Sequence, residues 1–177
     1  MKKIISVAIL ACITMALCSQ PNGNLTYLKL FVINENNDLL MVRYKGIWEP
    51  IGGTYDSKLP IVDYVEEKVS VCNIECGEIR LRGLFSVYYG KTSLPYVYHY
   101  YTIEYEGGDI IPPSDCDSVA WFSAGDVMDK IAFKDMGRVF EKIQGNDDLW
   151  SGSWYIIKNA ETKERKFEKK QDFFKLN

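Results

Sequence analysis

The sequence predicts one mixed α/β domain behind a short apolar leader, and three observations carry this prediction. The chain has 177 residues, of which 47% are apolar and 14% aromatic, which is enough for one sizeable core. Segments with the period of two that is typical of strands alternate with a few segments of helical period. In front of them, a charge-free apolar run from Ile4 to Leu17 follows the positive start Met1-Lys2-Lys3.

The leader is typical of an export signal. Its apolar run is shorter than the ~20 residues needed to cross a hydrocarbon core, but it fits the hydrophobic part of a secretory signal. We expect residues 1–23 to be a signal peptide with a short linker, and 24–177 to be a single domain without a membrane span. The protein is then periplasmic, secreted or lipid-anchored. A buried N-terminal helix or an uncleaved anchor is the alternative, and Cys18 and Cys12 are both candidates for lipidation.

Charge and composition exclude several classes of function. The formal net charge is −3, and without the two leader lysines 19 basic residues face 24 acidic ones, which gives −5. This opposes a nucleic acid or an anionic membrane held by bulk electrostatics. The single histidine, His99, excludes sites that need two imidazoles. The domain keeps an odd number of cysteines, which leaves one disulfide open among Cys72, Cys76 and Cys116.

The predicted elements follow in a regular order. Strands are expected over 25–33, 39–44, 78–89, 96–105, 118–122, 154–158 and 166–174. Helices are expected from Pro60 for about three turns, over 124–131 with Ser123 as N-cap, and over 134–144. The first two strands and the last two are expected to pair as hairpins, with a loop over 46–53. Helical spacing predicts a buried stripe on the first helix: Val62, Val65, Val69 and Cys72.

The order of these parts resembles the Nudix hydrolase family over roughly residues 25–143. Trp48-Glu49-Pro50-Ile51-Gly52-Gly53 is close to the family's W-x-x-P-G-G, with the proline one place early, and a helix follows. Ala120-Trp121-Phe122-Ser123 is similar to its later W-F segment, and the hairpin at 150–154 to extensions of some members. The resemblance implies a Nudix-type α/β/α sandwich with a C-terminal β-hairpin extension. It also implies hydrolysis of a nucleoside-diphosphate-linked (pyrophosphate) substrate with Mg²⁺ or Mn²⁺.

That chemistry needs three helical glutamates at i, i+3 and i+4, whose carboxylates share one face and hold the metal against a pyrophosphate. Family spacing from Gly53 places these positions at Lys68, Val71 and Cys72, none of which is a hard oxygen ligand. A register one residue shorter leaves a single carboxylate, Glu67. The catalytic box is therefore predicted to be degenerate, with activity impaired or absent.

A register five residues shorter recovers three carboxylates, Asp63, Glu66 and Glu67. They are the candidate metal ligands, with Glu67 the candidate catalytic residue. Val62 and Val69 would then replace the family's arginine and glycine, and the distance to the next strand fits the unshortened register better. A row of solvent-facing charges is the ordinary alternative.

The resemblance also implies ligand contacts at Arg43, Trp48, Gly52 and Gly53. A surface arginine and a core or rim tryptophan are the plain alternatives for the first two. A row of tyrosines on one strand suits stacking on a base or sugar and equally packing under a helix: Tyr96, Tyr98 and Tyr100. His99 lies on the other face and is expected to be structural.

Two functions follow. The first is an exported Nudix-like hydrolase of a nucleotide-type small molecule, and the second is a non-catalytic module that holds a ligand or an unknown protein partner on the same scaffold. The two functions can be distinguished by which side chains of the first helix point toward the cleft. Asp63, Glu66 and Glu67 in the cleft favour the hydrolase, whereas Val71 or Cys72 there favours the binding module.

Overall fold

The computed structural model describes residues 25–90, 94–159, 161 and 165–177. The expected signal peptide over 1–23, with Cys12 and Cys18, lies outside these residues, so export and lipidation stay predictions. Within the described part, no helix is long and apolar enough to cross a membrane.

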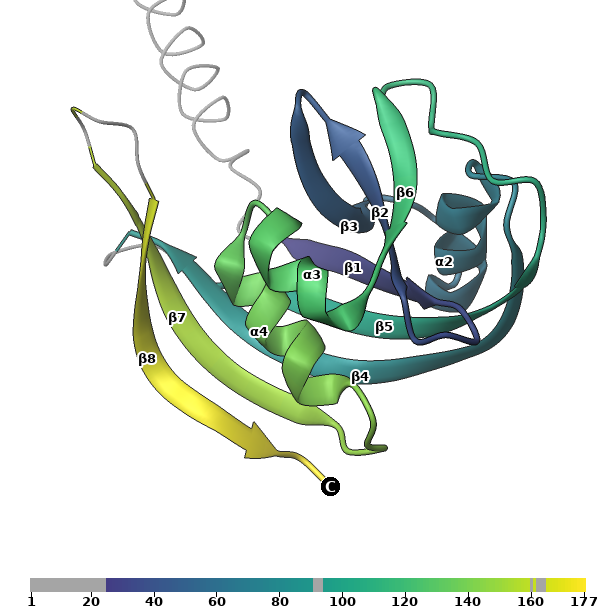
Figure 1. Ribbon diagram of the computed structural model, residues 1–177. Helices are drawn as coiled ribbons and strands as arrows, with labels where there is room; N and C mark the ends of the chain where they lie inside the picture. Colours follow the sequence, from purple (N-terminus) through teal and green to yellow (C-terminus); the bar gives the residue numbers. More distant parts are fainter. Residues whose placement is uncertain (1–24, 91–93, 160, 162–164) are drawn as a thin grey trace, which may run out of the picture.

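A mixed sheet forms the centre of the domain, and its described strands number eight (Figure 1). Their order across the sheet is β6-β2-β3-β1-β5-β4-β7-β8. Two pairs are parallel, β1 with β5 and β4 with β7, and the other neighbours are antiparallel. The bounds are β1 (Thr26–Ile33), β2 (Leu39–Tyr44), β3 (Ile47–Thr54), β4 (Glu75–Tyr89), β5 (Tyr96–Gly107), β6 (Ser118–Phe122), β7 (Trp150–Lys158) and β8 (Arg165–Lys175).

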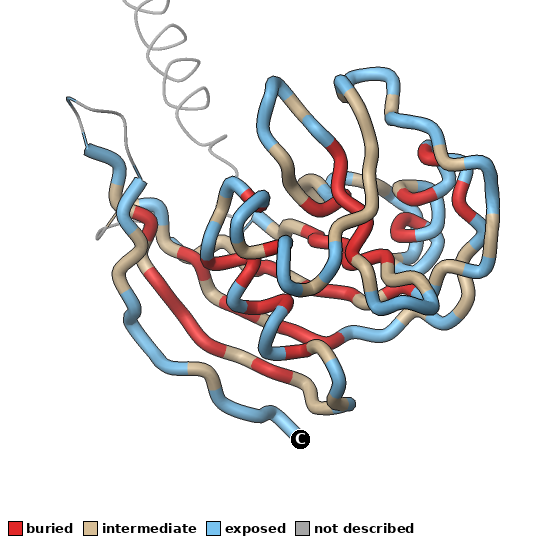
Figure 2. Tube along the Cα trace, in the orientation of Figure 1, coloured by how far each residue is buried: buried red, intermediate tan, exposed pale blue. Residues whose placement is uncertain are grey.

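Helices cover both faces of this sheet, which confirms the predicted fold class. Helix α2 (Ile61–Ser70) packs on one face, and α3 (Ala124–Lys130) and α4 (Lys134–Ile143) pack on the other (Figure 1). Each side has its own apolar cluster. In Figure 2 the buried stretches follow the central strands and the inner sides of the helices, whereas the edge strand β8 is largely exposed.

Strand β3 joins two parts of the sheet. Its first half pairs with β2, where Glu49 lies opposite Val42, and its second half pairs with β1, where Ile51 lies opposite Leu30. The loop predicted for 46–53 is therefore wrong. The pattern misled because proline and paired glycines are uncommon in a central strand.

The same strand alters the predicted first hairpin. β1 and β2 pair with each other only at Ile33 and Leu39, because β3 lies between them over the rest of their length. A Cβ on Gly52 would overlap the carbonyl oxygen of Leu28, so β3 approaches β1 there as only glycine permits.

Helix α2 begins at Ile61, one residue after the predicted start, with Pro60 as its N-cap, and its buried face differs from the prediction. Val62 is 46% exposed, and Tyr64 takes its place beside Val65 and Val69. The Tyr64 hydroxyl donates to the Thr54 carbonyl at 2.8 Å, which anchors this face to the end of β3.

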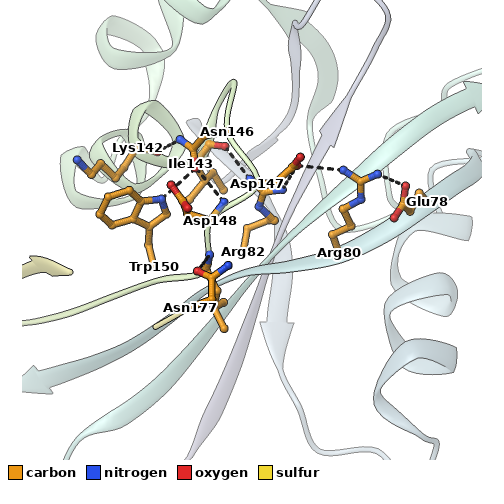
Figure 3. A network of polar contacts seen from close by, with 11 residues as sticks. Glu78, Arg80, Arg82, Lys142, Ile143, Asn146, Asp147, Asp148, Trp150 and Asn177 are labelled. Atoms are coloured by element: carbon orange, nitrogen blue, oxygen red, sulfur yellow. Dashed lines mark hydrogen bonds and ion pairs between the residues drawn. The ribbon is translucent and has the colours of Figure 1, made fainter. Parts of the chain in front are cut away.

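The C-terminal hairpin of β7 and β8 is confirmed, with β7 beginning at Trp150 rather than Trp154 and β8 one residue longer at each end. A polar network fixes the turn between α4 and β7 (Figure 3). Arg82, only 5% exposed, pairs with Asp147 at 2.8 Å and reaches the Ile143 carbonyl at 3.5 Å. The C-terminal Asn177 accepts the Leu149 N–H at 2.8 Å.

Candidate functional site

Two cavities border β3, and the larger has a volume of about 300 Å³. It lies between β2 and β3, helix α2 and the loop before β6. We call it the α2 cavity. Its charged and reactive lining residues are Glu49, Lys68, Asp115 and Cys116, with Gly52 and Val71 beside them.

Helix α2 turns Lys68 and Val71, and none of its carboxylates, toward this cavity. Asp63, Glu66 and Glu67 are exposed and lie outside its lining. In the described residues, no group of three or more histidine, cysteine, aspartate or glutamate side chains is placed to hold a metal ion. A metal site at Asp63, Glu66 and Glu67, with Glu67 catalytic, stays a prediction and would have to form outside the α2 cavity.

The charged side chains around the α2 cavity differ in their partners. The Lys29 ammonium pairs with the Glu49 carboxylate at 3.0 Å, and their side chains are only 9% and 19% exposed. The Lys68 ammonium lies over the Tyr64 ring, 5.0 Å from its centroid. Asp115 is exposed on the loop, and its Oδ1 accepts the Cys116 thiol at 3.7 Å.

The thiols near the α2 cavity are not activated nucleophiles. Burial raises the pKa of Cys72 to about 11. Burial and then the Asp115 charge raise the pKa of Cys116 to about 11 as well. Both thiols stay protonated at neutral pH, and reactive cysteines need the opposite shift. All three described cysteines are free.

The second cavity, of about 130 Å³, lies on the other face of the sheet, under the start of α4. We call it the α4 cavity. Tyr27 and Tyr98 line it and stack on each other, with ring centroids 5.1 Å apart and an interplanar angle of 11°. The hydroxyls of Tyr98 and Tyr89 form a hydrogen bond of 2.8 Å. The other lining residues are Lys29, Glu49, Phe133, Asp135, Met136, Ile156 and Arg165.

Asp135 is the unusual group in the α4 cavity. It is only 8% exposed, and its Oδ1 has no hydrogen-bond partner of good geometry in the described part of the chain. The neighbouring Trp154 indole N–H is likewise buried and unpaired, and it is the nearest donor available to this carboxyl. Burial raises the pKa of this carboxyl to about 6, against the opposing effects of its own and Met136's backbone N–H, the Lys29 charge and the Trp154 indole. A buried acceptor without a partner is rare and needs an explanation.

The structure places some, but not all, of the ligand-contact residues implied by the resemblance at a cavity. Gly52 lines the α2 cavity, whereas Arg43 and Trp48 line neither cavity. Trp48 packs on Phe122, with ring centroids 4.9 Å apart. Arg43 is exposed and donates through Nε to the Gly46 carbonyl at 3.4 Å. Ligand contacts at Arg43, Trp48, Gly52 and Gly53 stay predictions.

Packing under a helix is confirmed for Tyr100, which is fully buried in the core below α4, whereas Tyr98 lines the α4 cavity and stacking on a base or sugar stays a prediction. Sequence reasoning missed Asp135 and Lys29. A lysine inside the apolar run of β1 was the available signal for Lys29. Asp135 had none, because an acidic residue in the first turn of a helix is ordinary.

No protein-family model matches the chain, and no curated protein matches its sequence. Solved structures do match. A MutT protein from Bacillus halodurans aligns with a TM-score of 0.65 at 14% identity, covering 85% of this chain and 97% of that one. A NUDIX hydrolase from Nitrosomonas europaea aligns at 0.62 and 17% identity, covering 77% and 81%. The chain has the Nudix fold.

A third match is the NUDIX domain of Shewanella oneidensis NrtR, solved in complex with ADP ribose. Its TM-score is 0.58 at 14% identity, with 73% of this chain and 96% of that one covered. The resemblance in Trp48–Gly53 is thus confirmed at the level of the Nudix fold. Function has to be argued from the two cavities, because one fold carries many activities.

Proposed function

We propose that this exported Nudix-fold protein binds a nucleotide-type small molecule and has lost most or all metal-dependent hydrolysis. The observation that carries the proposal is the unpaired Oδ1 of Asp135, a buried residue that lines the aromatic α4 cavity. An unmet buried acceptor beside a stacked tyrosine pair favours a planar ring that brings its own N–H donors.

The α4 cavity has the mixture of groups that ligand sites use: apolar and aromatic walls with a few convergent polar atoms. Tyr27, Tyr98 and Phe133 contribute rings to its walls, and the Arg165 guanidinium lies 4.9 Å from the Phe133 ring centroid. The Asp135 carboxylate can accept hydrogen bonds. A nucleobase that carries a ring N–H beside an amino group combines a flat ring for the aromatic walls with hydrogen-bond donors for Asp135. A hydrocarbon ring would leave the Asp135 oxygen unpaired, which costs about 1–3 kcal/mol.

The α2 cavity supports the loss of hydrolysis. Mg²⁺ and Mn²⁺ prefer several hard oxygen ligands. The two carboxylates that line this cavity are Glu49, already paired with Lys29, and Asp115 on the exposed loop. Helix α2 adds a cation and an isopropyl group, so the lining does not fit a divalent metal.

Calorimetric titration of nucleosides and nucleoside diphosphates in EDTA tests the binding. We expect a purine-type ligand with adjacent N–H donors to bind, and Asp135→Ala to weaken it at least tenfold. Asp129→Ala is the matched control, since Asp129 is an exposed acid at the end of α3. The proposal is wrong if no nucleoside binds, or if the two variants bind equally.

Hydrolysis is tested with the same diphosphates in Mg²⁺ and Mn²⁺, by release of inorganic phosphate or of a nucleoside monophosphate. We expect no turnover above background. Metal-dependent turnover that Glu67→Gln abolishes would instead establish the carboxylates Asp63, Glu66 and Glu67 as the metal site.

A further inference from the structure

We propose that the end of the sheet where β1 begins and the β7–β8 hairpin turns is a docking surface for a bilayer that contains anionic lipid. The inference goes beyond the proposed function and depends on neither cavity. Its starting point is an uneven distribution of charge. Residues 150–177 contain seven basic and four acidic residues, a net charge of +3, whereas residues 24–149 contain 12 basic and 20 acidic ones, a net charge of −8. The hairpin is therefore a basic element on an acidic domain, which the total charge conceals.

Strand pairing brings the start of β1 and the hairpin to the same end of the sheet. The Leu25 carbonyl, just before β1, accepts the Val97 N–H at 3.0 Å at the start of β5. The Gly90 N–H, just after β4, donates to the Ile156 carbonyl of β7 at 3.1 Å. Because β1, β5, β4 and β7 are consecutive neighbours, the start of β1 lies three strand spacings from the hairpin, on the order of 15 Å. In Figure 1 the ends of β4 and β7 and the start of β8 lie together at the left.

Three exposed cations lie at the tip of the hairpin: Lys158, Arg165 and Lys166. They form no ion pair with a carboxylate of the described residues. Lys158 lies directly opposite Arg165 in the β7–β8 ladder, and like charges in this arrangement destabilise a hairpin. Glu161, the described acidic residue between them in the chain, leaves two positive charges in excess. A partner that supplies several anionic groups would relieve this repulsion.

The cations farther along β8 differ from those at the tip. Lys169 and Lys175 are paired with aspartates at 2.7 and 2.8 Å. Lys170 lies over the Tyr88 ring, 3.8 Å from its centroid. The charge that has neither a carboxylate nor a place among the neighbouring strands is therefore concentrated at the tip, beside the start of β1.

Exposed apolar side chains at this end favour a bilayer over a nucleic acid or an acidic protein. Leu94, in the connection between β4 and β5, is 69% exposed, and Leu25 is 46% exposed. Cations beside exposed leucines suit the surface of a bilayer, where the cations meet headgroups and the leucines enter the acyl boundary.

The chain that precedes β1 agrees with this orientation. Cys18, a candidate for lipidation, comes seven residues before Leu25, a distance of at most about 25 Å along the chain. A lipid there would hold this same end of the domain near the bilayer. A single anchor binds reversibly, and a basic patch beside it supplies the second contact that stable attachment needs.

Co-sedimentation of the full chain with vesicles tests the surface, with phosphatidylcholine alone or mixed in equal parts with phosphatidylglycerol. We expect Lys158→Gln/Lys166→Gln to weaken binding to the mixed vesicles at least tenfold, since each lysine near an anionic surface contributes about fivefold. The loss should shrink as salt is added. The matched control is Lys45→Gln/Lys175→Gln, which removes the same charge at the opposite end of the sheet and should bind like the parent. Lys2 and Lys3 are present in every variant, so their contribution cancels.

Leu94→Asn tests the apolar contribution. It should weaken binding to the mixed vesicles severalfold at low and at high salt, because burial of a leucine in the bilayer is not screened. The inference is overturned if Lys158→Gln/Lys166→Gln binds the mixed vesicles like the parent, or if the control pair loses as much. Loss of self-association in that variant, with unchanged vesicle binding, would overturn it too and assign the surface to a second copy. None of the substituted residues lines either cavity, so the nucleoside titrations stand apart from these outcomes.

Discussion

The two cavities along β3 differ in almost every property although they share Glu49. The α2 cavity is the larger, at about 300 Å³, and of its charged lining residues Asp115 is exposed, whereas Lys68 and Glu49 are half-buried. The α4 cavity, at about 130 Å³, is lined by a stacked tyrosine pair and by a carboxyl group that is 8% exposed.

This contrast indicates which cavity determines ligand identity. A buried group without a partner discriminates strongly, because a ligand that leaves it unpaired loses the cost of its desolvation. The half-buried Lys68 of the α2 cavity discriminates less, because an ammonium attracts any anion. We therefore assign recognition of the ring to the α4 cavity. This assignment requires β3 to hold the shared wall in place.

Substitution of Gly52 in strand β3 should lower stability more than any other change considered below. In Gly52→Ala the new Cβ would overlap the Leu28 carbonyl oxygen, so β3 and β1 must separate. We expect a loss of about 3 kcal/mol or more in the free energy of unfolding, as for severe overpacking. Gly53→Ala is the control, since its Cβ would meet nothing within 4 Å. Urea denaturation of the two variants measures the contrast, and equal losses would contradict this role of Gly52.

The second effect concerns the ionisation of Asp135. Burial raises the pKa of this carboxyl to about 6 from an ordinary 3.8, so the folded state holds its proton more tightly than the unfolded chain. Its contribution to stability is fully present below about pH 4 and is lost as the pH rises to about 6. The difference is worth up to about 3 kcal/mol at 1.36 kcal/mol per pKa unit.

Asp135→Asn should remove this pH dependence, because the amide does not titrate. The unfolding free energy of the variant relative to the parent should rise between pH 4 and pH 7 by up to about 3 kcal/mol. Denaturation at several pH values measures the difference curve, in which contributions from other carboxylates cancel. A flat curve would show that Asp135 is solvated and would remove the basis for a discriminating α4 cavity.

The third effect concerns the wall that both cavities share. Lys29→Met leaves the Glu49 carboxylate, 19% exposed, without its cation, and we expect a loss of about 2 kcal/mol in the free energy of unfolding. The double variant Lys29→Met/Glu49→Leu should recover most of that loss, because it leaves no unpaired charge. Strict additivity of the two substitutions in a double-mutant cycle would show that the pair contributes nothing to this wall.

The sequence predicted most of the fold because its signals were local. β6, α3 and the start of α4 follow from short apolar runs and from Ser123, whose side chain caps α3 as expected. β3 was missed since its pairing compensates for Pro50 and two glycines, and that compensation depends on β1 and β2, which are distant in sequence.

The sequence predicted some residues of the candidate site and missed others, again because only local patterns can be read from it. Spacing from Gly53 found Lys68 and Val71, which do line the α2 cavity, because helix periodicity fixes the direction of a side chain. The third residue of that register, Cys72, lies in the core instead. Asp135 escaped notice because its burial comes from β1, β5 and β7, and no pattern within α4 reveals it.

The smallest change in stability is expected from the two arginines near the C-terminal end of α4, Arg82 and Arg80. Arg82, buried against the Ile143 carbonyl and Asp147, holds the end of α4 and hence the wall that carries Asp135 (Figure 3). Arg80 also contacts Asp147, and Glu78 as well, but it lies at the surface. We expect Arg82→Met to cost about 1–2 kcal/mol, since a buried hydrogen-bonding group and its partners are lost.

Arg80→Met should leave the unfolding transition unchanged, because exposed ion pairs contribute little. The arginines also hold the pKa of Asp147 below its usual range through the Arg82 hydrogen bond and the charges of both residues. That contribution to stability is present at neutral pH and is lost as the pH falls through the lowered pKa, opposite to the effect of Asp135. Amide hydrogen exchange in α4 measures the anchoring directly. Faster exchange in Arg82→Met than in Arg80→Met is expected, whereas equal rates would mean that the α4 wall is held by its apolar stripe alone.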